Sequence, residues 1–137
     1  MTGGICNSFK RDLLAGLHQP GDEYRMALYT SDAPIDPDTV IYIGAGEVAG
    51  KGYEPGGRVI HFQGPTLMDG IARLGWSSPP VWENSTITAR AALIYNTSRD
   101  NRAVAVMDFG RDYSSTNGPF SVGCPPSDSE AALIRIR

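Results

Sequence analysis

Residues 88–110, TARAALIYNTSRDNRAVAVMDFG, restrict the possible folds of this chain more than any other segment. Two runs rich in alanine, β-branched and aromatic residues flank the polar TSRDN, which is the pattern of a β-hairpin. Close to the turn Leu93 and Ile94 point to opposite faces, as do Ala103 and Val104. A sheet with one solvated face alternates apolar and polar residues instead. We therefore expect a partner sheet to cover one face, and a helix or a neighbouring subunit to cover the other.

The glycine and proline content favours a β-rich fold over a helical one. Sixteen glycines and ten prolines in 137 residues suit many turns, and the length suits a single β-rich domain over residues 1–137. We predict a mainly β fold, an antiparallel β-sandwich or jelly-roll-like arrangement with one N-terminal helix. Besides the hairpin, strands are expected at residues 23–30, 39–44, 58–64 and 69–76 and within 118–126 and 131–137, with a loop at 77–85 and one possible helical turn at 129–132.

The N-terminal helix is predicted at residues 8–18, SFKRDLLAGLH. Phe9, Leu13, Leu14 and Leu17 fall on one apolar stripe of such a helix. Residues 1–7 precede it and are predicted to form an adaptable arm. We expect this arm and the helix to touch a neighbouring protein, since exposed terminal arms often become ordered on binding.

Charge, hydropathy and cysteine content argue against several classes of protein. The net charge is −3 and no cluster of Lys or Arg stands out, so we expect no nucleic acid partner. No stretch approaches the length of an apolar membrane span, and the first residues lack the apolar region of a secretory signal. Cys6 and Cys124 stand alone without zinc-ligand spacing, and we expect two reduced thiols in a product made in the cytoplasm.

The glycine-rich segment 40–50, VIYIGAGEVAG, matches the G-x-G-x-x-A pattern of dinucleotide-binding loops through Gly44, Gly46 and Ala49. That pattern works only where a helix follows and points its N-terminus at the pyrophosphate. The following residues, GKGYEPGG, cannot form this helix. Asp32, Asp36 and Asp38 likewise lack the spacing of a calcium loop. We therefore predict no cofactor and no metal site.

Candidates for catalysis are few. His18 and His61 are the only histidines, and neither has a nucleophile or carboxylate at a recognisable spacing. His18 is expected at a helix end, where a cation stabilises the helix dipole, and His61 is expected to be half exposed. Trp76 and Trp82 flank SSPPV, where an exposed pair could stack on a sugar, although such residues are more often core or interface anchors. We predict no catalytic residues and a protein that is not an enzyme.

The order of segments resembles a family of small virion structural proteins of tailed bacteriophages. The resemblance rests on SFKRDLLAGLH, YRMALYTSDA, EVAGKGYEPGGRVI, TARAALIYN, RAVAVMDFG and AALIRIR. It implies a structural component of the particle, most like a capsid decoration or cement protein. Such a protein would bind and stabilise the shell of major capsid protein from the capsid surface, as a homotrimer. The resemblance carries no catalytic residue.

Two other functions remain open from the sequence. The protein could be a head–tail adaptor or tail component of the virion, or a carbohydrate-binding β-sandwich module that uses Trp76 and Trp82. For an assembly role we select large apolar residues as interface candidates, each of which could equally belong to the core. These candidates are Phe9, Leu13, Tyr53, Trp76, Trp82, Ile94 and Val104.

Overall fold

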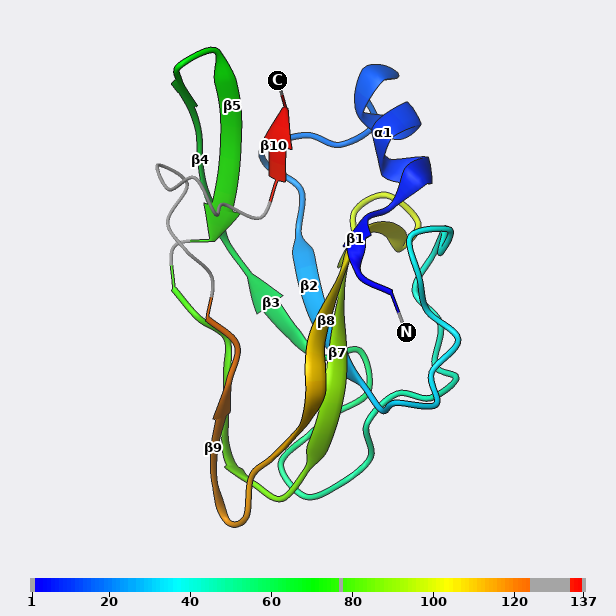
Figure 1. Ribbon diagram of the computed structural model, residues 1–137, viewed down its shortest axis with the longest axis vertical. Coiled ribbons are helices and arrows are strands. Elements are labelled where there is room, and N and C mark those ends of the chain that lie inside the picture. Colours follow the sequence, from blue (N-terminus) through cyan, green and yellow to red (C-terminus); the bar gives the residue numbers. More distant parts are fainter. Residues whose placement is uncertain (1, 77, 124–133, 137) are drawn as a thin grey trace.

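The computed structural model describes residues 2–76, 78–123 and 134–136. Its largest unit is a five-stranded antiparallel sheet in the order β1-β8-β7-β2-β3 (Figure 1). Strands β7 and β8 are the two arms of the expected hairpin. The elements of this part are β1 (Gly4–Ile5), helix α1 (Asn7–Leu14), β2 (Tyr24–Tyr29), β3 (Arg58–Ile60), β7 (Thr88–Asn96) and β8 (Arg102–Ser114).

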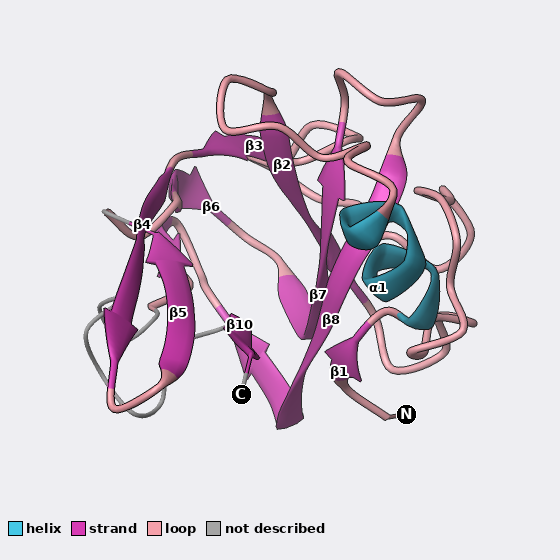
Figure 2. Ribbon diagram, turned by 90° about the horizontal axis from the view of Figure 1, so that it is seen from above, coloured by secondary structure: helices cyan, strands magenta, loops and turns pink. Residues whose placement is uncertain are grey.

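Two smaller antiparallel sheets form a second layer beside the first (Figure 2). One, here called the small sheet, has the order β10-β5-β4, and the other pairs β6 with β9. Their strands are β4 (Phe62–Met68), β5 (Ile71–Trp76), β6 (Val81–Ser85), β9 (Gly118–Ser121) and β10 (Ile134–Ile136). The described chain is mainly β with one helix near its N-terminus, which confirms the predicted sandwich-like class.

The hairpin is buried on both faces, as its sequence pattern predicts. Ile94 and Val104 have no exposed area. On one face the irregular segment 31–57 lies over the hairpin, where the ring of Tyr42 stacks on that of Tyr95 with centroids 4.8 Å apart. Helix α1 packs against β8, and its Phe9 joins the same core cluster. The expectation that a helix packs against the hairpin is confirmed. Part of the hairpin is covered by the irregular segment 31–57 rather than by a sheet.

The strand predicted at residues 39–44 is wrong. Ile41 makes one isolated bridge to Arg102, and the chain then turns away at Gly46, whose φ is +78°. A Cβ on Gly46 would lie 2.5 Å from the Cα of Ala33. The glycines in this segment therefore serve close backbone packing, and apolar content alone did not distinguish it from a strand.

A partly buried carboxylate holds this irregular segment to the sheet. Glu47 accepts hydrogen bonds from the hydroxyls of Tyr42 at 2.5 Å and Tyr53 at 2.6 Å, and from the N–H of Gly56 at 2.8 Å. The Tyr53 hydroxyl in turn accepts from the N–H of Leu28 in β2 at 2.9 Å. Loop, carboxylate and sheet thus form one hydrogen-bonded unit, which explains how GYEPGG is held in place.

The N-terminal segment 1–7, predicted to be an adaptable arm, belongs to the fold from Gly4 onwards. Gly4 and Ile5 pair with β8. Cys6 is fully buried, and its N–H donates to the carbonyl of Val104 at 2.9 Å. The prediction failed because the apolar Ile5 and Cys6 were too few to register as a strand.

Helix α1 is shorter than the predicted 8–18 and ends at Leu14. Gly16 adopts a φ of +74°, and the N–H of Gly16 bonds back to the carbonyl of Leu13 at 3.1 Å. This left-handed turn is a common way to stop a helix. His18 therefore lies beyond the helix, and its predicted role as a cation at the helix end is corrected.

Other boundaries shift where the chain changes sheet. The strand predicted at 58–64 is divided at His61, because β3 pairs with β2 whereas β4 pairs with β5. The strand predicted at 69–76 begins only at Ile71, after a turn with positive φ at Asp69 and Gly70. The loop predicted at 77–85 contains β6. Cys124 and the helical turn predicted at 129–132 lie outside the described residues.

Candidate functional site

A largely apolar cavity of about 420 Å³ lies between helix α1 and the small sheet. These elements gather at one end of the molecule, where α1, β10 and the β4–β5 hairpin approach one another (Figure 1). Polar side chains reach the cavity wall from the segment that follows the helix. The apolar lining includes Phe9 and Leu13 of α1, Tyr24 and Val104 of the large sheet, and Leu74 and Ile134 of the small sheet.

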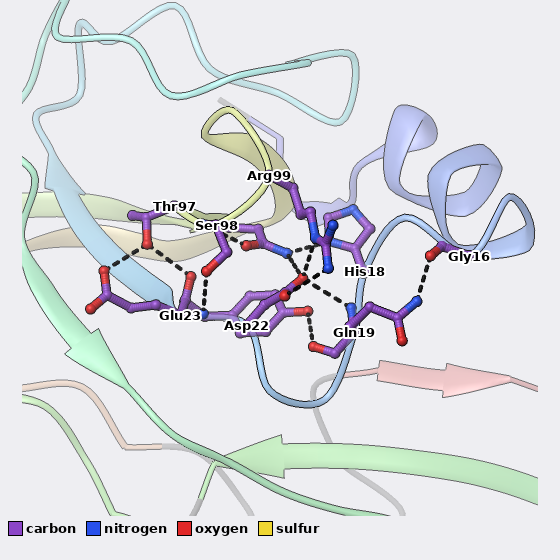
Figure 3. A network of polar contacts seen from close by, with 10 residues as sticks. Gly16, His18, Gln19, Asp22, Glu23, Thr97, Ser98 and Arg99 are labelled. Atoms are coloured by element: carbon purple, nitrogen blue, oxygen red, sulfur yellow. Dashed lines mark hydrogen bonds and ion pairs between the residues drawn. The ribbon is translucent and has the colours of Figure 1, made fainter.

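His18 and Asp22 belong to a polar network at one side of this cavity (Figure 3). Asp22 forms two hydrogen bonds with the guanidinium of Arg99, at 2.9 and 3.2 Å, and accepts from the N–H of Gln19 at 3.0 Å. The side-chain amide of Asn96, at the end of β7, donates to Asp22 at 2.9 Å and meets Nδ1 of His18 at 3.0 Å. The network joins the helix–strand connection to the hairpin turn.

The hydrogen bonds fix the tautomer of His18. Asn96 Oδ1 accepts from the N–H of Ser98 at 3.0 Å, which places the amide nitrogen toward His18. An amide nitrogen only donates, so Nδ1 of His18 accepts and the ring proton lies on Nε2. That Nε2 is buried and has no hydrogen-bond partner among the described residues.

Asp22 and His18 differ in the direction of charge that the structure favours: Asp22 is held ionised and His18 is held neutral. The hydrogen bonds from Arg99 hold the pKa of the Asp22 carboxyl well below its usual range. Burial lowers the pKa of His18, although the carboxylates of Asp12 and Asp22 oppose this effect. His18 is therefore neutral and Asp22 ionised near neutral pH.

Acid should destabilise this network in two steps. The free energy of unfolding is expected to fall as the pH drops through about 6.5, because the unfolded chain then binds a proton on this histidine more readily than the folded one. A second loss begins below about pH 4, where the unfolded chain protonates Asp22 first. Urea unfolding of wild type and His18→Gln at a series of pH values measures the first step. The variant should be less stable at neutral pH but show a flatter curve between about pH 7 and 5.

His61→Gln is the matched control, since His61 is exposed on the chain between β3 and β4. The free energy of unfolding of His61→Gln should change with pH between about pH 7 and 5 as that of wild type does. If the free energy of unfolding of His18→Gln changes just as steeply, the first loss of stability does not come from His18.

The register of the small sheet creates a continuous apolar face. Leu67 of β4 and Ile136 of β10 both pair with Ala72 of β5, and Ile134 pairs with Leu74. Directly paired residues share a face, and so do residues two apart on one strand. Here called the apolar face, this surface consists of Phe62, Leu67, Ala72, Leu74, Trp76, Ile134 and Ile136.

Exposure along the apolar face rises from its inner to its outer end. Trp76 and Ile134 are buried, at 3% and 5% exposed, whereas Ile136 is 49% and Leu67 75% exposed. The inner end lines the cavity opposite α1, and Phe62 packs edge-on against Tyr24 at 4.6 Å. At the outer end the described residues leave Leu67 and Ile136 largely exposed, although Ala72 and Ile136 still belong to the cavity lining.

The structure brings together three of the predicted interface residues. Phe9, Leu13 and Val104 all line the cavity, Leu13 being only partly buried. Phe9, Val104, Trp76 and Ile94 are core residues of the single chain, at 5% exposure or less. Their selection as surface contacts is corrected, because large apolar residues in a chain of this size fill its core first.

The two remaining candidates lie together elsewhere. Tyr53 and Trp82 stack with centroids 6.0 Å apart and are both buried. They line a second cavity of about 350 Å³ together with Arg58. Since Trp76 and Trp82 are both buried, the exposed tryptophan pair that a sugar-binding platform needs is not found on the described surface.

Sequence reasoning did not single out the exposed residues of the apolar face. Leu67 and Ile136 look unremarkable in the sequence, since their common face appears only once β4, β5 and β10 pair. The alternation of apolar and polar residues at Ala72, Arg73 and Leu74 was one pattern that could have indicated this face. No sequence pattern indicated the ion pair of Asp22 with Arg99, because 77 positions separate them.

The cavity has a largely apolar lining. Its described lining contains no serine, threonine or cysteine next to His18. Within the described ranges no three His, Cys, Asp or Glu side chains are grouped so that they could hold a metal ion. The described helix is too short to cross a membrane.

Comparison of the chain with protein-family models, with curated proteins and with solved structures returns no match.

Proposed function

We propose that this protein is a non-enzymatic virion structural protein of a tailed bacteriophage. It decorates the capsid surface as a homotrimer, and binds and stabilises the shell of major capsid protein. The observation that carries this proposal is the open outer end of the apolar face. Large exposed apolar patches on a folded domain are typical of interaction surfaces.

The distribution of polar groups supports an assembly role. The carboxylates of Glu47 and Asp22 are both occupied by hydrogen bonds within the chain. These hydrogen bonds tie the two carboxylates to the loops around them. Three of the exposed large apolar side chains, Leu67, Met68 and Ile136, lie on the β4–β5 hairpin and on β10, where Leu67 and Ile136 flank Ala72. A rigid β body with an apolar contact surface suits a protein that joins others in a shell.

Quantitative mass spectrometry of purified virions from a phage whose genome encodes this chain tests the proposal. A copy number comparable to that of the major capsid protein supports capsid decoration. A copy number of one small ring would instead favour the neck or tail. If the chain is missing from purified virions, the proposed function is wrong.

A further inference from the structure

We infer that the cavity between helix α1 and the small sheet binds a small, uncharged, apolar molecule. The inference goes beyond the proposed function, because decoration of a capsid requires no such ligand. The volume of about 420 Å³ falls within the range of about 300–1,000 Å³ that is usual for small-molecule sites. It also far exceeds the roughly 10–15 Å³ that a single buried water needs. The cavity is therefore larger than a packing defect.

The walls of the cavity leave apolar area for a ligand to cover. Leu13 of α1 lies on one wall, and Phe62 of β4 and Leu74 of β5 lie on the wall of the small sheet. These three side chains pack against the core but are only partly buried. A ligand between them would remove further apolar area from water, which is favourable. Water in the same place would find few polar partners on such walls.

The charge distribution of the lining favours an uncharged ligand. Two charged residues, Asp22 and Arg73, belong to the described lining. Both carboxylate oxygens of Asp22 already accept hydrogen bonds from Arg99. Arg73 alternates with the apolar residues of β5, so its side chain points to the opposite face of the small sheet. A charged ligand would therefore lose its hydration in the cavity without gaining a close counter-charge.

The lining runs from the core of the protein to its surface. Phe9 and Val104 lie at the inner end and are 5% and 0% exposed. Gln19 of the segment after α1 and Pro65 of β4 also line the cavity, and both are exposed. A ligand can thus enter from solvent and reach core side chains.

The dimensions of the cavity favour a small molecule over a segment of a partner protein. An α-helix with its side chains is about 10–12 Å across, so one turn alone takes up about 420–610 Å³. A helix would therefore not enter. The edge strand β4 contains Pro65, which has no N–H to donate, so a strand added there would lack a ladder bond.

Fluorescence titration of the full chain with N-phenyl-1-naphthylamine tests the inference. This probe is uncharged and apolar, and its emission rises when it leaves water. Wild type should bind it saturably. The matched probe 8-anilino-1-naphthalenesulfonate has the same rings and one added sulfonate. It should bind at least about tenfold more weakly, because the sulfonate would lose its hydration in the cavity.

Two variants on opposite walls locate the bound probe. Ala72→Phe fills the cavity from β5, and Leu13→Asn makes the α1 wall polar. Each should weaken binding of the uncharged probe by about tenfold or more. A loss in both variants distinguishes the cavity from the exposed end of the apolar face, which α1 does not border.

The matched controls carry the same substitutions at the end of α1. Ala15 and Leu14 are exposed and lie outside the described lining. Ala15→Phe and Leu14→Asn should bind the uncharged probe as wild type does. Thermal unfolding of all four variants verifies that a loss of binding is not a loss of fold.

Three results would overturn the inference. The first is a wild-type chain that shows no saturable binding of the uncharged probe. The second is a sulfonate probe that binds as tightly as the uncharged one. The third is a folded Ala72→Phe or Leu13→Asn variant that binds like its control. None of these measurements depends on whether the chain is found in virions, so the inference and the proposed function can fail separately.

Discussion

Ile94→Lys is expected to prevent the chain from folding under conditions in which wild type is stable. Ile94 has no exposed area and lies in β7 between Met26 of β2 and Ala105 of β8. A lysine there loses the packing of isoleucine and buries a charge without a partner. Together these effects should cost about 5 kcal/mol or more, which is comparable to the whole stability of a small domain. Val104→Lys should behave alike for the same reason.

Circular dichroism and urea unfolding of the purified variants measure this effect. Leu14→Lys is the matched control, because it introduces the same charge at a residue that is 92% exposed. Its free energy of unfolding should stay within about 0.5 kcal/mol of wild type. An Ile94→Lys protein with a wild-type urea midpoint would show that this face is open to water, contrary to the structure.

The same hairpin shows which parts of the fold can be predicted from sequence. Its two runs and its turn are contiguous, so the pattern of apolar residues reports directly on local structure. That both faces are buried also follows from the pattern, since Leu93 and Ile94 are adjacent and both apolar. The sequence could not say what lies over them. The stacking of Tyr42 on Tyr95 joins residues far apart in the chain, and no local pattern encodes it.

The candidate site was harder to predict for the same reason. Each residue at the outer end of the apolar face belongs to a different strand, and the register of β10 on β5 decides that Ile136 and Leu67 share a face. The interface candidates chosen from sequence were the largest apolar residues. Burial removed Trp76 and Trp82 from the surface and left smaller, less conspicuous residues there. Size and hydropathy therefore identified the core better than the exposed apolar face.

The sequence predicted that no helix follows the glycine-rich segment 40–50, and the structure confirms this. The glycines of the irregular segment 31–57 allow backbone to approach backbone. Gly57 is the extreme case, with a φ of +77° and a site at which a Cβ would lie only 1.8 Å from the carbonyl oxygen of Met26. Met26 lies in β2, between β3 and β7, so it cannot move without disturbing the centre of the sheet.

Gly57→Ala is therefore expected to destabilise the protein by more than about 3 kcal/mol, because the left-handed conformation and the collision both oppose it. Gly70→Ala separates the two causes. Gly70 has the same φ of +77°, yet nothing lies within 4 Å of its Cβ position, so this variant should lose only about 1 kcal/mol. Urea unfolding of both variants gives the difference, which measures the close approach of the loop to β2 alone. Equal losses would mean that backbone conformation, and not contact with Met26, is what requires glycine at this position.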